Sequence, residues 1–183
     1  MYLDTETNER YWLGFSISRS QDLDWWFHTA ARLHSDLDLV WLWPKFLEGV
    51  QGRGYPRGFG LDYDHRKFQD GDDEVTSYLK MQLWGGDDTK ELYRLLRTHP
   101  HFRDMVVLSK VRLKELADES EPDAFAIQDI KYTGKFTTRG TDIATHLSTL
   151  NKVRDDYQQK IEAIEDKYAL KWRALGVALN YVV

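Results

Sequence analysis

The chain contains no cysteine, and this absence excludes several kinds of chemistry together. Disulfide bonds, cysteine-ligated zinc sites and thiol catalysis all require this side chain. The first ten residues are polar and acidic, without the apolar segment of a secretory signal. We therefore expect a soluble protein located in the cytoplasm.

Long apolar runs and a surplus of positive charge are also lacking. The longest apolar stretch, residues 39–43, falls far short of the ~18–20 residues that a membrane-spanning helix needs, so we expect no membrane partner. Lysine and arginine number 25 against 30 aspartates and glutamates, which gives a formal net charge of −5. General nucleic-acid binders are usually basic, so only a local basic patch could serve that function here.

The composition indicates a folded domain of ordinary size. Hydrophobic residues make up 42% of the 183 residues and aromatic residues 14%, which is enough for a core and too much for a disordered chain. With seven tryptophans and ten tyrosines, some aromatic rings must lie near the surface. Exposed rings of this kind stack on bases or anchor protein partners.

Hydrophobic periodicity predicts alternating elements in the first part of the chain. Residues 10–18 alternate and predict a strand, and apolar residues at helical spacing over 23–37 predict an amphipathic helix that ends by Pro44. Five glycines within residues 49–60 predict a loop or hairpin, and residues 58–64 are the start of a candidate second strand.

The middle of the chain continues this alternation. Residues 75–84 predict a half-buried strand, residues 87–98 a short helix, and residues 105–113 another strand. The order strand, helix, strand, strand, helix, strand is typical of the ferredoxin-like split βαβ arrangement. We therefore predict an α+β fold with an antiparallel sheet, extended by a further strand over residues 125–132.

The last third of the chain predicts one long amphipathic helix, capped by Thr141 or Asp142 and ~50 Å long. It either packs on its own sheet or overhangs it and binds a partner, a basic protein or a second copy. The candidate partner-binding side chains are Tyr157, Ile161, Ile164, Tyr168 and Trp172. We divide the chain into a ferredoxin-like part, residues 1–123, and a strand or hairpin with this helix, residues 124–183, on the same domain. Residues 177–183 predict a short strand or a docked tail.

Three places carry residues suited to acid–base or phosphate chemistry. His34 follows the first predicted helix, where it is either a general acid or base or an ordinary surface histidine. Arg53 and Arg57 stand among glycines and aromatics, in either a phosphate-binding loop or a plain surface loop. The third place is a basic cluster before the last helix, either a phosphate contact or an exposed hairpin. Its members are Lys131, Lys135 and Arg139.

The acidic residues between 62 and 74 could suggest a cation site. Calcium loops need a defined alternation of ligands that ends in a bidentate glutamate, and this run lacks that register. We therefore interpret the run as a solvated turn and expect neither a metal nor a cofactor.

The order of elements over residues 11–150 resembles the CRISPR repeat-processing endoribonucleases of subtype I-F, in the ferredoxin-like repeat-associated RNA-binding superfamily. The aromatic strand 11–15 is similar to the family's first strand, and the pair Leu33–His34 matches the position of its catalytic histidine. The strand at 125–132 and the helix after Asp142 look like the elements with which the family grips an RNA hairpin.

The resemblance implies antiviral RNA processing without a metal ion. The ribose 2′-hydroxyl would attack the adjacent phosphate while His34 handles a proton. The phosphates would be held by Arg53, Arg57, Lys131, Lys135 or Arg139. The family's gripping helix is rich in arginine, whereas residues 145–165 here carry several acidic side chains.

The alternative is a non-catalytic, acidic protein-interaction module that docks through its C-terminal helix. It would be a defence or counter-defence component, or a subunit of a larger assembly. The net negative charge suits a basic partner.

Overall fold

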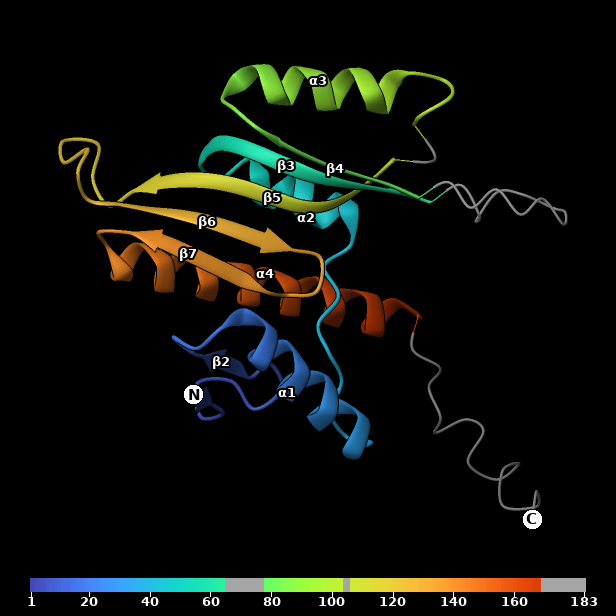
Figure 1. The fold of residues 1–183 in the computed structure, drawn as a ribbon. Coiled ribbons are helices and arrows are strands. Elements are labelled where there is room, and N and C mark those ends of the chain that lie inside the picture. Colours follow the sequence, from blue (N-terminus) through green and yellow to red (C-terminus); the bar gives the residue numbers. More distant parts are fainter. Residues whose placement is uncertain (65–77, 104–105, 169–183) are drawn as a thin grey trace, which may run out of the picture.

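A computed structural model describes residues 1–64, 78–103 and 106–168 (Figure 1). The strands are β1 (Tyr2–Asp4), β2 (Leu13–Phe15), β3 (Tyr55–Asp64), β4 (Tyr78–Trp84), β5 (Val106–Leu116), β6 (Phe125–Lys131) and β7 (Phe136–Gly140). The helices are α1 (Ser20–Leu33), α2 (Pro44–Gln51), α3 (Asp87–Thr98) and α4 (Ile143–Tyr168). The predicted mixed α+β class with antiparallel strands and a C-terminal helix is confirmed.

Five strands form one antiparallel sheet in the order β4-β3-β5-β6-β7, and β1 pairs with β2 in a separate two-stranded sheet. β4 and β5 run parallel with β3 between them, so β4, α3 and β5 form a split βαβ unit. The complete ferredoxin-like order is not confirmed, because β2 pairs with β1 instead of entering the large sheet. β6 continues the same sheet, so the large sheet crosses the expected boundary at residue 123.

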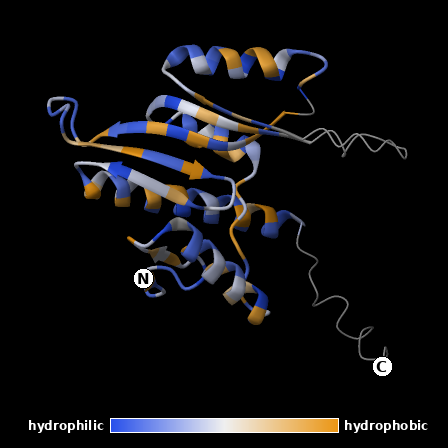
Figure 2. Ribbon diagram, in the orientation of Figure 1, coloured by the Kyte–Doolittle hydropathy of each residue, from blue (hydrophilic) through white to orange (hydrophobic). Residues whose placement is uncertain are grey.

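One face of the sheet is apolar and is covered by helices. Alternate residues of neighbouring strands point to the same side, and here they bring Phe59, Val111 and Ile130 together. Figure 2 shows the alternation as bands along the strands. Helices α2, α3 and α4 close this face with buried apolar side chains. These are Phe46, Leu47 and Val50 from α2, Tyr93 from α3, and Leu150 and Val153 from α4.

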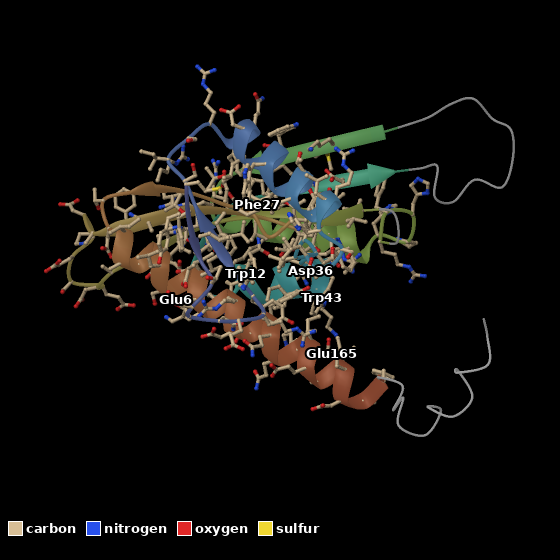
Figure 3. All side chains as sticks on the ribbon, turned by 90° about the horizontal axis from the view of Figure 1, so that it is seen from below. Glu6, Trp12, Phe27, Asp36, Trp43 and Glu165 are labelled. Atoms are coloured by element: carbon tan, nitrogen blue, oxygen red, sulfur yellow. The ribbon has the colours of Figure 1, made fainter. Side chains whose placement is uncertain are left out.

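The first helix and the last lie on opposite sides of the sheet (Figure 3). In Figure 1, α1 lies beyond the β7 edge, and no described helix stands in front of β3, β5 and β6. The backbone N–H of Leu42 donates to the carbonyl of Tyr132, so the segment between α1 and α2 passes the β6–β7 turn. The second face of the sheet is therefore largely open among the described residues.

The sequence left open whether the long helix packs on its own sheet or extends beyond it, and α4 does both. Asp142 accepts hydrogen bonds from the backbone N–H groups of Ala144 and Thr145 and caps α4 as predicted. The first half of α4 packs on β6 and β7, with Leu150 and Val153 buried. The second half lies against α2 and the N-terminal segment, where the rings of Tyr157 and Tyr11 are 5.5 Å apart. Trp172 and residues 177–183 lie outside the described residues.

Two predicted elements need correction. The strand predicted over residues 10–18 is only Leu13–Phe15. The single strand predicted over residues 125–132 is followed by β7, and the two form the hairpin that the sequence left open as an alternative. Residues 49–51, predicted as loop, end the helix α2, which begins at Pro44. Proline is favourable at the first position of a helix, where no backbone N–H is needed, so Pro44 starts a helix as well as limiting the preceding one.

Candidate nucleic-acid interface

The open face of the large sheet carries most of the cationic side chains that the strands contribute. Its members follow from the register of the five strands. Among the residues whose side chains the structure describes, they are Lys80, Gln82 and Trp84 on β4; Tyr55, Gly58, Gly60 and Asp62 on β3; Val107, Lys110, Arg112, Lys114 and Leu116 on β5; Phe125, Ile127, Asp129 and Lys131 on β6; and Thr137 and Arg139 on β7. Among these described side chains, six cations thus stand against two carboxylates in a chain of net charge −5, and Asp64 holds the next position of the same register on β3. We call this set the open face.

At its centre, an aromatic ring lies against a fixed cation. The guanidinium carbon of Arg112 is 3.6 Å from the ring centre of Trp84, and the ammonium nitrogen of Lys110 is 4.7 Å from it. Arg112 donates two hydrogen bonds to the carboxylate of Asp129, one of them 2.6 Å long, and Lys110 lies 3.0 Å from the same carboxylate. The ring and both cations are therefore held in defined positions.

The charges around Asp129 determine its protonation. Burial acts to raise the pKa of Asp129, but hydrogen bonds from Arg112 and Lys110 outweigh this effect and hold the pKa below its usual range. The hydrogen bond with Asp129 also raises the pKa of Arg112. Asp129 is thus ionised at neutral pH and orders the cations on β5.

Glycine in β3 makes room for this arrangement. Gly58 has φ +145°, and a Cβ atom there would overlap the carbonyl of Leu83 and the indole of Trp84. At Gly60, a Cβ atom would stand 3.0 Å from Cβ of Lys110. Because neither residue has a side chain, Trp84 and Lys110 can lie close to the β3 backbone. The second half of the predicted glycine loop therefore belongs to strand β3, and its glycines form part of the open face.

A group of lysines lies at the end of the open face next to the β6–β7 turn. Burial lowers the pKa of Lys131, and the neighbouring charges of Lys135 and Lys110, and of Lys80 to a smaller degree, lower it further. Lys135 pairs with Asp24 of α1, with Nζ–carboxylate oxygen distances of 2.5 and 2.6 Å. The other three lysines therefore repel the charge of Lys131, and Asp24 offsets part of that repulsion.

The structure separates the predicted phosphate-binding residues into two groups. Lys131 and Arg139 belong to the open face, and Lys135 stands beside it. Arg57 is exposed at the start of β3, where its carbonyl accepts a hydrogen bond from Gly85. Arg53 lies on the helix-covered side and pairs with Asp156 of α4. Arg53 therefore does not join the lysines.

His34 stands at the end of α1 with an exposed side chain, and its backbone N–H donates to the carbonyl of Ala30. It follows Asp24 by ten residues, which corresponds to ~15 Å along the helix axis. Asp24 is the residue of α1 that contacts Lys135, so this length of helix separates His34 from that contact.

The predicted partner-binding residues of α4 differ in exposure. The ring of Tyr157 packs between Trp43 and Phe46 at 6.0 and 5.8 Å, and Ile161 is half-buried. Ile164 and Tyr168 are 47% and 68% exposed. Ile164 borders a groove of about 490 Å³ between α2 and α4. Trp43, Phe46, Val50, Arg53 and Lys160 also line this groove.

A polar network lies on the other side of the sheet, beneath α4. Nδ1 of His146 is 2.7 Å from the hydroxyl of Thr138 and 2.9 Å from the amide oxygen of Gln128. Gln128 and Thr149 both donate to the carboxylate of Glu115. Burial lowers the pKa of His146, so its ring is neutral at pH 7. The network satisfies buried polar groups where α4 meets the sheet.

Several residues of the open face were not predicted as site residues, namely Lys80, Trp84, Lys110, Arg112 and Lys114. A signal was present, because cations at every second position of a strand, as in residues 110–114, share one face. Among the described residues, no group of three or more His, Asp or Glu side chains could hold a metal ion. No helix in the described ranges is long and apolar enough to cross a membrane.

Comparison with known proteins places the chain in a family. Over 195 aligned residues it is 26% identical to "Uncharacterized protein MJECL33" of Methanocaldococcus jannaschii, which covers 87% of this chain and 48% of the relative. The chain thus spans about half the length of that relative. No solved structure matches. A model of the MJECL33-like protein family matches residues 1–180. The chain therefore belongs to the MJECL33-like protein family.

Proposed function

We propose that this chain is an RNA-binding protein and that the open face is its binding surface. The observation that carries the proposal is the direct cross-strand pairing of two like charges, Lys110 on β5 and Lys131 on β6. Like charges in this position destabilise a sheet, and burial together with Lys135 and Lys110 lowers the pKa of Lys131. A bound polyanion would remove this repulsion.

The shape of the surface supports a nucleic acid as the polyanion. Proteins that bind single-stranded nucleic acids combine a cationic surface along the backbone with aromatic rings on which bases stack. The open face offers both, since Trp84 stands among Lys80, Lys110 and Arg112. The resemblance of the element order to CRISPR repeat-processing proteins favours RNA over DNA.

A binding assay with matched charge variants tests the proposal. The probe is a labelled RNA hairpin with a single-stranded 3′ extension, in buffer with EDTA, compared with DNA of the same sequence and with an acidic peptide. The double variant Lys80→Gln/Lys131→Gln should bind RNA about tenfold more weakly than the parent. The control Lys90→Gln/Lys152→Gln has the same net charge, and its exposed lysines lie on α3 and α4.

The control should bind as the parent does. Equal losses in both double variants would show that net charge alone drives binding and would contradict the assignment of the open face. Tighter binding of the acidic peptide than of RNA would instead identify a protein partner.

Metal-independent RNA cleavage is a second candidate function, and the exposed side chain of His34 favours it. The 2′-hydroxyl would attack the adjacent phosphate, form a 2′,3′-cyclic phosphate and release the 5′-hydroxyl of the next nucleotide, with His34 transferring a proton. Because ~15 Å of helix separates His34 from Asp24, the scissile nucleotide would lie along α1, away from the contact between Asp24 and Lys135. Products from the parent in EDTA, absent for His34→Ala, would support cleavage, and intact RNA with the parent would exclude it under those conditions.

Docking through α4 is the alternative function, and the exposed side chains of Ile164 and Tyr168 favour it. A second copy of the chain is the simplest partner to test. Sedimentation velocity over a range of concentrations should show self-association that Ile164→Asp weakens. A single monomeric species at every concentration would argue against a second copy.

A further inference from the structure

The partly exposed indole of Trp84 stacks on a largely buried cation. The side chain of Arg112 is only 16% exposed and that of Lys110 only 13%, whereas Trp84 is 45% exposed. The guanidinium carbon of Arg112 lies 3.6 Å from the ring centre, so the buried cation and the indole are stacked. The 45% exposure of Trp84 leaves surface of this residue open to a ligand.

The ring is held in place before any ligand arrives. Gly58 lies beneath it and leaves no space for a different side chain. Arg112 is anchored by two hydrogen bonds to Asp129, so the cation under the ring cannot easily move away. Binding to a fixed ring costs little side-chain entropy, because the ordering has already occurred on folding.

The surroundings of the ring distinguish it from an ordinary exposed tryptophan. Trp25 on α1 is more exposed, at 69%, but it is not in register with any cation of the sheet. Trp84 faces Gly58 and, one strand further, Arg112, and Lys80 is four residues before it on the same side of β4. From β4 to β6 the open face measures ~14 Å across, enough for a few nucleotides.

We propose that Trp84 stacks on the base of an unpaired nucleotide while the surrounding lysines hold the neighbouring phosphates. The inference rests on the proposed RNA binding and makes it more specific. In a duplex each base is already stacked between its neighbours, so its face cannot lie on an indole that is held on a sheet. The open face therefore selects single-stranded RNA.

The test compares Trp84→Leu and Trp84→Phe with the parent, using fluorescence anisotropy of a labelled 12-nucleotide oligoadenylate and of the same strand in a duplex. Leucine can still cover Arg112 but has no aromatic face. The parent should prefer the single strand, and Trp84→Leu should bind it about tenfold more weakly with little change for the duplex. Trp84→Phe should lie between them. The matched control Trp25→Leu should bind as the parent does.

Failure of this inference differs from failure of the proposed function. If Trp84→Leu binds the single strand as tightly as the parent, while Lys80→Gln/Lys131→Gln does not, stacking is wrong and RNA binding by the open face stands. If the parent binds no RNA, both are wrong. Thermal melting checks that Trp84→Leu folds.

A second measurement serves if that variant does not fold. Oligoadenylate should quench tryptophan emission in the parent and quench it clearly less in Trp84→Phe. Equal quenching in both proteins would overturn the inference.

Discussion

The two faces of the large sheet are built from alternate residues of the same strands, but they differ in their side chains and in how far helices cover them. On one face, Phe59, Val111 and Ile130 are fully buried beneath helices. On the other face, glycines stand where large side chains would be expected, and cations gather around one tryptophan. The difference shows that one face forms the core of the protein, whereas the other carries the charged side chains to which we assign ligand binding as a proposal.

The largest expected difference between the faces concerns stability. Phe59→Ala should lower the free energy of unfolding by ~3–5 kcal/mol, because it leaves a cavity in the core. Lys80→Ala, on the exposed side of the neighbouring strand β4, should change it by less than ~0.5 kcal/mol. Urea denaturation measures both. Comparable losses would show that the open face is also a stability element.

Substitution of a glycine in β3 should give the next largest effect on stability. Gly58→Ala should destabilise the fold by ~1–3 kcal/mol, because φ is +145° and the new methyl group would overlap the β4 backbone and Trp84. Gly49→Ala is the matched control. Its site in α2 has no atom within 4 Å, so alanine should be neutral or stabilise the helix by up to ~1 kcal/mol. Thermal melting that ranks the variants in the reverse order would contradict the described register of β3.

The core face should also respond to pH through His146. Burial lowers the pKa of its ring in the folded protein, whereas an unfolded chain has a histidine pKa of ~6.5. The unfolded state therefore binds more protons at acidic pH, and stability should fall as the pH drops below ~6.5. The carboxylate of Glu115, which contacts this network through Gln128, should reduce the loss. His146→Gln should flatten the profile between pH 8 and 5, and an unchanged profile would assign the slope to other groups.

The smallest expected effect concerns RNA affinity and the ion pair beside the open face. Asp24 pairs with Lys135 and so competes with a phosphate for it. Asp24→Asn should raise RNA affinity about two- to fivefold, the range expected for an exposed ion pair. Asp22→Asn makes the same charge change at an exposed position of the same helix, without this contact. Equal gains in the two variants would mean that long-range charge, not competition for Lys135, is responsible.

Local patterns were sufficient to predict several elements of the fold. The helix over residues 87–98, the strand at 125–131 and the cap at Asp142 follow from short-range signals and were predicted nearly as observed. The eight-residue helix α2 was missed because its glycine and the following glycine-rich stretch suggested a loop. Tertiary packing of Phe46, Leu47 and Val50 stabilises this helix despite the weak local preference.

The candidate site could be predicted only in part, because its residues come from separate strands. Lys131 and Arg139 were identified as a local cluster, but their association with Lys80 and Arg112 depends on strand order and register. Register is set by pairing between distant parts of the chain, which no single-sequence pattern reveals. The close contact between Gly58 and Trp84 also becomes visible only when β3 and β4 are paired.

The salt dependence of RNA binding tests the central claim most directly. The logarithm of the association constant should fall linearly with the logarithm of salt concentration, with a slope of about −0.7 for each phosphate contact to a single strand. Lys80→Gln/Lys131→Gln should make that slope shallower by about 1.4, while Lys90→Gln/Lys152→Gln leaves it unchanged. Identical slopes for the parent and both double variants would contradict the assignment of the open face as the RNA-binding surface.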